Sequence, residues 1–277
     1  MNQLSYINVD GTFTVVLSDN QPYTFDSSHP EYMNLVECVK VGDIVEIEKL
    51  IDVGTVVSNW SEGIICFKDN VLTYNDEPVP LPQAKTTINM IKQGFDATAM
   101  INFLSQEYNN PSRSSREQGY EFLAKKGITI CADGYVAGYK GVSIHEGPDF
   151  VDLMGRTVTD GDYVDKYTGK SYRNNIGDHN TMPRRRVQDD PNIGCGEGLH
   201  IGTYDYAHNW AGSNGAVILV KFSPEHIVSV PSDHSFEKLR VCDYHIVGES
   251  RGQIEDLIYD EEADEELDDL YNDDYDV

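Results

Sequence analysis

Two segments decide how the second half of this chain folds: MPRRRVQDDPNIGCGEGLHIGTYDYAHNW, from Met182 to Trp210, and AVILVKF, from Ala216 to Phe222. The apolar segment has the composition of a buried strand, and YDYAHNW before it is helix-like. Three glycines stand within five residues of the first segment, and each costs backbone entropy on folding. Arginines, a tight turn and a supporting strand follow one another as in a binding site built on a scaffold, so we predict a site here.

The residues around these segments predict a sheet. Residues 128–137 form a hairpin pattern about the turn Asp133-Gly134, and residues 227–230 and 241–247 read as further strands. Residues 160–186 are polar and are predicted to form a long ordered loop. Because the connections are short, we predict an α+β domain with a mainly antiparallel sheet for residues 128–250.

Residues 1–127 are predicted to form an N-terminal α+β region that is rich in strands and carries a short helical bundle. Residues 12–25 resemble a hairpin, and residues 55–57 are predicted to be a strand. Apolar positions at helical spacing then predict three helices, at residues 86–93, 97–108 and 111–126. Their apolar stripes are typical of a packed core rather than of a cofactor site.

Charge separates the end of the chain from its body. The formal net charge is −26, and residues 254–277 hold thirteen acidic residues and no basic one. Such a segment cannot bury enough apolar surface to fold alone, so residues 251–277 are predicted to be a disordered acidic tail. It is a solvating tail, a decoy for a phosphate backbone, or a motif that docks on a basic partner. The docking motif would use Leu257, Leu267, Leu270 and Tyr271.

The remaining body is acidic as well, which excludes general binding to nucleic acid or to an anionic membrane surface. The five cysteines are scattered and form no C-x-x-C pair, so a disulfide framework is not expected. We find neither a secretory leader nor about 18 consecutive apolar residues. These features predict an intracellular protein without a membrane span.

The candidate binding site is the glycine-bearing segment itself. Guanidinium groups bind carboxylate or phosphate with two parallel hydrogen bonds, so the arginine triplet fits an anionic ligand. It fits equally an internal pairing with Asp189 and Asp190 or with the acidic tail. The candidate binding residues are Arg184, Arg185, Arg186, Cys195, Glu197, His200 and Tyr204.

Reactive chemistry is less well supported by the sequence. Cys195 and His200 resemble a nucleophile and its base, with Asp205 to orient the histidine, but a hydrogen-bonded structural histidine is favoured. Cys195, His200 and His208 offer three zinc ligands without a fourth, so no metal site is expected. Three other histidines are read as edge or loop residues: His226, His234 and His245. No catalytic residue and no cofactor is predicted.

Motifs spread over some 220 residues resemble the rIIB-like proteins of tailed bacteriophages, a lysis-inhibition family. The sequence departs from that family at Gly196, where serine is usual, and in its long acidic tail. The motifs that carry the resemblance are DSSHP (26–30), GFDAT (94–98), NPSRS (110–114), ICADGY (130–135), YKGV (139–142), MPR (182–184), CGEGLHIGTYDYA (195–207), VSVPSD (228–233) and KLRVCDY (238–244).

The resemblance implies an early phage protein that acts by protein–protein contact with an rIIA-like phage protein at the inner face of the host membrane. It implies roles in lysis timing and in resistance to host exclusion or defence, with a host factor as a further partner. Membrane association would come only through a partner, from the host cytoplasm. The alternative is an NAD- or nucleotide-binding enzyme, because the glycine turn, GLH, tyrosine-bearing helix and apolar strand resemble a segment of ADP-ribosyltransferases.

Overall fold

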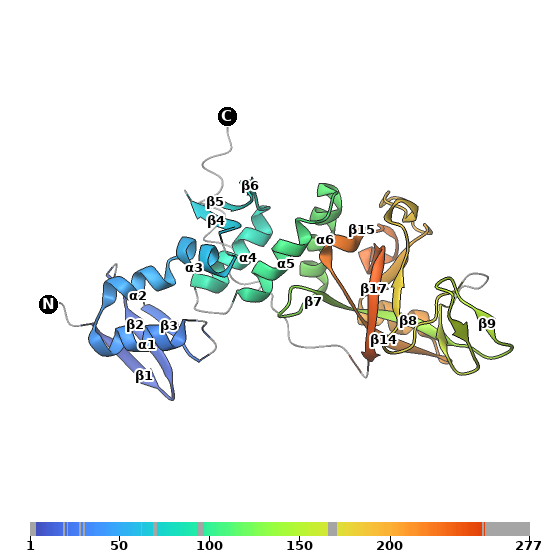
Figure 1. Ribbon diagram of the computed structural model, residues 1–277, viewed down its shortest axis with the longest axis horizontal. Coiled ribbons are helices and arrows are strands. Elements are labelled where there is room, and N and C mark those ends of the chain that lie inside the picture. Colours follow the sequence, from blue (N-terminus) through green and yellow to red (C-terminus); the bar gives the residue numbers. More distant parts are fainter. Residues whose placement is uncertain are drawn as a thin grey trace. The chain divides into compact units, whose positions relative to one another are not determined.

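The computed structural model describes residues 4–252, apart from residues 19, 21, 28, 30, 62, 69–70, 93–96, 166–170 and 251. The described chain divides into two compact units, with the division between Leu104 and Ser105. Figure 1 shows the helices and strands of each. The tail residues proposed to dock a partner, Leu257, Leu267, Leu270 and Tyr271, lie outside the described residues.

Unit 1 begins with a three-stranded antiparallel sheet on which helices pack. Strands β1 (Tyr6–Val9), β2 (Thr12–Val16) and β3 (Pro22–Phe25) pair in chain order. Helices α1 (Tyr32–Val41) and α2 (Ile44–Ile51) complete the core with their apolar faces. The buried residues of this core are Phe13, Val15, Tyr23, Phe25, Leu35, Val39, Ile47 and Ile51.

The strand predicted for residues 55–57 is wrong, because helix α3 (Val53–Trp60) includes them. The carboxylate of Asp52 accepts a hydrogen bond from the Thr55 N–H at 2.8 Å and caps the helix. The cap outweighs the strand preference of the β-branched residues at this point. The rest of the unit contains β4 (Ile65–Lys68), β5 (Val71–Tyr74), β6 (Glu77–Pro78), α4 (Leu81–Lys92) and the start of α5 (Thr98–Glu107).

Unit 2 is built on a nine-stranded antiparallel sheet. Seven strands follow the order β12-β17-β14-β8-β13-β16-β15, and β7 and β11 also pair with β8. The strands are β7 (Thr129–Ile130), β8 (Val136–Ile144), β11 (Tyr163–Val164), β12 (His179–Thr181), β13 (Leu199–Gly202), β14 (Gly215–Phe222), β15 (Ile227–Ser229), β16 (Lys238–Val241) and β17 (Asp243–Glu249). A separate ribbon pairs β9 (Phe150–Val151) with β10 (Thr157–Val158). The predicted α+β class with antiparallel sheets is confirmed.

Two helices pack on this sheet at close range. Helix α7 (Tyr204–Ala211) lies against β8, where a Cβ atom on Gly141 would stand 2.2 Å from the carbonyl oxygen of Ala207. Helix α6 (Arg113–Lys126), which we grouped with the N-terminal region, contacts β15. There the hydroxyl of Ser115 donates a hydrogen bond to the Val228 carbonyl at 2.6 Å. The approach at Gly141 leaves no room for any other residue.

Charged groups hold the segment between β9 and β12. The buried carboxylate of Asp152 accepts two hydrogen bonds from the Arg156 guanidinium, at 2.7 and 2.8 Å. Arg173 donates hydrogen bonds to the carboxylate of Asp178 from Nη2 at 2.8 Å and from Nε at 2.9 Å. Burial opposes ionisation of Asp152, yet the hydrogen bonds from Arg156 and Arg173 hold the pKa of Asp152 below its usual value. The polar loop predicted at residues 160–186 is thus tied down by ion pairs and contains β11 and β12.

Candidate functional site

The site that the sequence points to is a cavity of about 320 Å³ in unit 2. It opens beside strands β8 and β13 and helix α7, so the floor comes from the sheet and one wall from the helix. Aromatic rings and charged groups share the lining. The lining residues are Tyr139, Lys140, Gly141, Leu153, Asp165, Tyr172, Met182, Arg186, Gly196, Glu197, Gly198, Leu199, His200, Tyr206 and Trp210.

The glycine-rich loop beside the cavity is wound around the guanidinium of Arg240. This arginine, on β16, is fully buried and donates hydrogen bonds to the carbonyl oxygens of Gln188 at 3.3 Å and Gly194 at 3.0 Å, and also to that of Ile193. Its remaining contacts include the hydroxyl of Ser229 at 3.1 Å. A buried charge is tolerated when its donors are all met in this way.

The close approach of the loop to buried charged side chains explains why glycine stands at positions 194 and 196. A Cβ atom on Gly196 would stand 2.4 Å from the Cβ of Gln188 and 3.2 Å from the guanidinium carbon of Arg240. A Cβ atom on Gly194 would meet the carboxylate of Asp233 at 2.6 Å, and that carboxylate binds Lys238 at 2.8 Å. The glycines therefore let the loop close over two buried cations, which is a structural role.

His200 is held in its neutral form. Its Nε2 atom accepts a hydrogen bond from the Nε–H of Arg240 at 3.4 Å. Burial, with the nearby positive charges of Lys140, Lys238 and Arg240, lowers the pKa of His200 to about 3. A neutral imidazole whose acceptor nitrogen faces an arginine is a poor general base. This geometry agrees with the structural role favoured for His200.

The three consecutive arginines point to different surroundings, because they form a single turn of 3-10 helix, η1 (Arg184–Arg186). Arg184 turns inward and donates hydrogen bonds to the side chain of Asn110 at 2.8 Å and to the carbonyl of Ile227 at 2.8 Å. Arg185 is exposed to solvent. Arg186 forms an ion pair with Glu197 at the edge of the cavity. The triplet is therefore no single anion-binding cluster.

Of the seven candidate residues, the structure brings three to the cavity: Arg186, Glu197 and His200. Cys195 is exposed, and among the described residues no hydrogen bond joins it to His200. Tyr204 lies on the other side of α7, where its ring makes an edge contact with Tyr139 at 5.5 Å and it lines a smaller hollow of about 220 Å³. The expected internal partners also differ, since Glu197, rather than Asp189 or Asp190, pairs with the arginine turn.

Several residues of the site were not predicted from the sequence. Lys140 and Asp165 form an ion pair of 3.0 Å in the cavity wall, and Lys140 also lies 5.6 Å from the centre of the Tyr244 ring. Tyr206 and Trp210 stack along α7 at 6.1 Å. The signal for the buried cations was present, since KLRV places a lysine and an arginine at alternate positions of an apolar strand. In combination, the site offers aromatic faces and hydrogen-bond donors to a small planar or anionic group.

The fold and the cavity define an α+β protein whose second unit carries a loop fixed by buried cations. The family model described as Bacteriophage T4 protein rIIB matches residues 6–276. Protein rIIB of Enterobacteria phage T4 is 24% identical over 241 residues, which cover 87% of this chain and 72% of that protein. The chain therefore belongs to the family of Bacteriophage T4 protein rIIB, as the sequence motifs indicated. No solved structure matches the chain.

Among the described residues, no helix has both the length and the apolar composition needed to cross a membrane.

Proposed function

We propose that this protein is a non-enzymatic regulator of phage infection that acts by contact with an rIIA-like phage protein. In this proposal it affects the timing of host lysis and the resistance of the phage to host exclusion or defence, with a host factor as a second partner. It works from the host cytoplasm and reaches the inner face of the host membrane only through a partner. Membership of the rIIB family is the observation that carries the proposal.

The state of the candidate reactive residues supports this reading. Cys195 and His200 were the one nucleophile and base that the sequence offered. His200 is hydrogen-bonded to Arg240 and its pKa is lowered to about 3, while Cys195 is exposed outside the cavity. A protein whose loop is held rigid by buried cations presents a fixed surface, which favours recognition of a partner without an ordering cost.

Two surfaces are proposed for the partner. The exposed guanidinium of Arg185 lies beside the ion pair of Arg186 and Glu197, so it can bind a carboxylate on a partner. The acidic tail supplies a second surface through the apolar side chains that are spaced among its carboxylates. These tail residues are Leu257, Leu267, Leu270 and Tyr271.

The test is affinity purification of the tagged full-length protein from infected cells, followed by mass spectrometry. We expect the rIIA-like protein to co-purify, and we expect its recovery to fall with Arg185→Glu or with alanine at the four tail positions. Lys40→Glu is the matched control, because Lys40 is an exposed lysine of unit 1 and the charge change is equal. Failure to recover any rIIA-like protein with the unsubstituted chain would refute the proposal.

A second candidate function rests on the cavity alone. Its volume of about 320 Å³, its stacked Tyr206 and Trp210 rings and its Lys140 and Arg186 side chains fit part of a nucleotide such as NAD or ADP-ribose. If such a ligand binds, it raises the melting temperature, since a hundredfold excess over the dissociation constant stabilises by about 2.7 kcal/mol. Arg186→Ala removes a lining cation, and Arg185→Ala is its control. No shift with either ligand would dismiss this candidate.

A further inference from the structure

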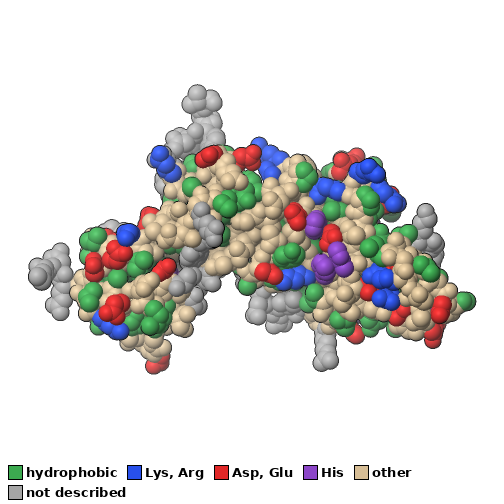
Figure 2. Space-filling model, in the orientation of Figure 1, with side chains coloured by type: hydrophobic (Ala, Val, Ile, Leu, Met, Phe, Trp, Pro, Cys, Tyr) green, Lys and Arg blue, Asp and Glu red, His purple; other side chains and the backbone are tan. Residues whose placement is uncertain are grey.

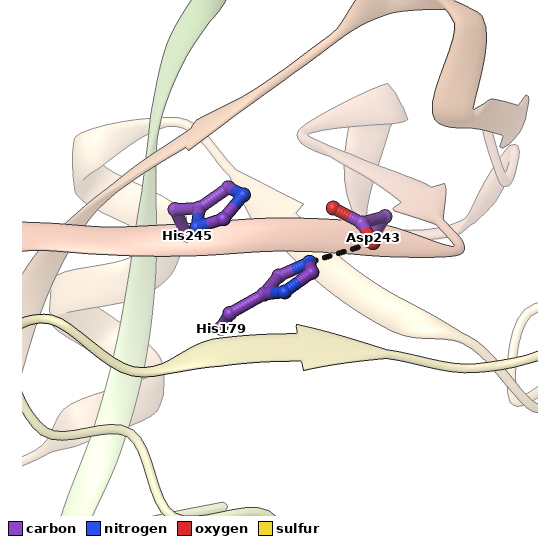
Figure 3. A group of neighbouring side chains, drawn as sticks. All are labelled: His179, Asp243 and His245. Carbon is purple, nitrogen blue, oxygen red and sulfur yellow. Dashed lines mark hydrogen bonds and ion pairs between the residues drawn. The ribbon is translucent and has the colours of Figure 1, made fainter.

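A group of metal-binding side chains stands apart from the cavity, on strands β12 and β17. His179 on β12 pairs with His245 on β17 in the antiparallel register. Asp243 precedes His245 by two residues on the same strand, so both side chains lie on the same face of the sheet. Figure 3 shows the two imidazole rings and the carboxylate gathered on this face.

The three side chains are close enough to share one ion. The Nε2 atom of His179 lies 2.7 Å from a carboxylate oxygen of Asp243, and the rings of His179 and His245 are stacked with their centres 4.0 Å apart. One ligand atom from each residue lies within 4.8 Å of the other two. Tetrahedral zinc with bonds near 2.1 Å needs ligand atoms about 3.4 Å apart. The two ring planes are only 10° apart, so the imidazoles must turn about their side-chain bonds before their nitrogen lone pairs converge on one ion.

We propose that His179, Asp243 and His245 bind one divalent transition-metal ion of the zinc class, with a fourth position open to water or to a partner. Two imidazoles and a carboxylate suit zinc and its neighbours, whereas magnesium and calcium prefer oxygen ligands throughout. The site is open to solvent at His179, where 45% of the side chain is exposed. The Asp243 side chain is more enclosed, with 17% exposed. Figure 2 shows histidine side chains grouped on this part of the surface of unit 2.

The surrounding charges allow a cation here. Lys221 on β14 pairs in register with His245, but its ammonium group is held by Asp133 and lies 5.3 Å from the centre of the Tyr135 ring. The Nε2 atom of His226 lies 3.4 Å from a carboxylate oxygen of Glu225.

An ordinary ion pair is the competing explanation. A hydrogen bond or ion pair from His179 to Asp243 accounts for the 2.7 Å contact without a metal ion. It does not use the imidazole of His245, which is stacked on that of His179. A shared metal ion uses all three groups. Because β12 is an edge strand, the ion also fixes that strand to β17.

Calorimetric titration of the full-length, metal-stripped protein with zinc at pH 7.5 tests the proposal. Excess magnesium in the buffer occupies the carboxylates of the acidic tail. We expect one zinc ion per chain, and we expect its affinity to fall at least tenfold in His179→Gln, in Asp243→Asn and in His245→Gln. His208→Ala is the control, because it removes an exposed histidine elsewhere and belongs to the Cys195, His200 and His208 set that the sequence offered.

A second measurement does not depend on the variants folding well. Cobalt replaces zinc and absorbs visible light when it is bound by imidazole nitrogens, so the unsubstituted protein should develop a cobalt spectrum that zinc then abolishes. Two results would overturn the proposal. One is the absence of a saturable zinc site in the unsubstituted protein, and the other is zinc binding that all three ligand substitutions leave unchanged.

Discussion

The core of the first sheet in unit 1 and the loop region of unit 2 are held together in different ways. Around β1–β3 the buried residues are aliphatic and aromatic, and stability comes from removing apolar surface from water. Around residues 188–200 the buried centre is the guanidinium of Arg240, which binds carbonyl oxygens of the loop. An apolar core tolerates substitutions that keep its volume, whereas a buried ion strongly destabilises the fold when its hydrogen-bond partners are removed.

The largest expected effect comes from Arg240→Met. Methionine fills part of the space but leaves the carbonyls of Gln188, Ile193 and Gly194 buried without a donor. We expect the free energy of unfolding of unit 2 to fall by about 4 kcal/mol. Hydrogen exchange measured by mass spectrometry should show faster exchange in residues 188–200 and unchanged exchange in unit 1. Arg185→Met, at an exposed site, should have almost no effect.

Leu35→Ala tests the apolar side of the comparison. Leu35 is fully buried in the core of unit 1, so its truncation leaves a cavity and should cost about 3 kcal/mol. Urea unfolding monitored by hydrogen exchange should show the loss of stability in residues 4–60 only. Met33→Ala is the control, since 76% of Met33 is exposed. An equal loss with both substitutions would mean that this region does not depend on its core.

The stability of the ion-paired region of unit 2 is also expected to depend on pH. Hydrogen bonds from Arg156 and Arg173 outweigh the burial of Asp152, so its pKa is lower in the folded protein than in the unfolded chain. The resulting stability is fully present above the unfolded pKa of about 3.9 and is lost as the pH falls towards the folded pKa. We expect Asp152→Asn to destabilise unit 2 at pH 6 and to weaken its loss of stability between pH 5 and about pH 3. Asp205→Asn, at an exposed helix position, should leave the pH profile unchanged.

The smallest effect is expected from Asp52→Ala, which removes the cap of α3. The loss should be about 1 kcal/mol, measured by thermal unfolding and by faster amide exchange at Thr55. Glu37→Ala breaks only an exposed ion pair of 3.8 Å with Lys40 and should change stability far less. If both substitutions had the same effect, the capping explanation for α3 would be wrong.

The parts of the fold that the sequence predicted correctly are those with strong local signals. The hairpin at residues 128–137, the helix α7 and the strand β14 each have a turn, a cap or a continuous apolar run. The predictions are wrong where contacts between residues distant in the sequence determine where a strand begins or ends. Residues 241–247 were read as one strand, but the chain divides at Cys242 between β16, which pairs with β13 and β15, and β17, which pairs with β12 and β14.

For the candidate site too, the sequence predicts only residues that lie near one another in the chain. Arg186, Glu197 and His200 stand near one another in the sequence, so one segment was enough to predict that they share a site. Lys140 and Asp165, which line the cavity, and Arg240, which binds His200 beside it, come from distant parts of the chain, and the sheet order brings them together. The pairing of His179 with His245 likewise depends on the register of β12 and β17, which periodicity does not supply.

The guanidinium beneath the glycine-rich loop also has a consequence for how this protein changes over evolutionary time. Because Arg240 binds main-chain oxygens, the shape of the loop is set from inside and does not depend on the side chains that face the solvent. Asp189, Asn192 and Cys195 are all exposed, so substitutions at these positions alter the outer surface without altering the path of the backbone. The loop is therefore a scaffold of constant shape on which different side chains can be displayed.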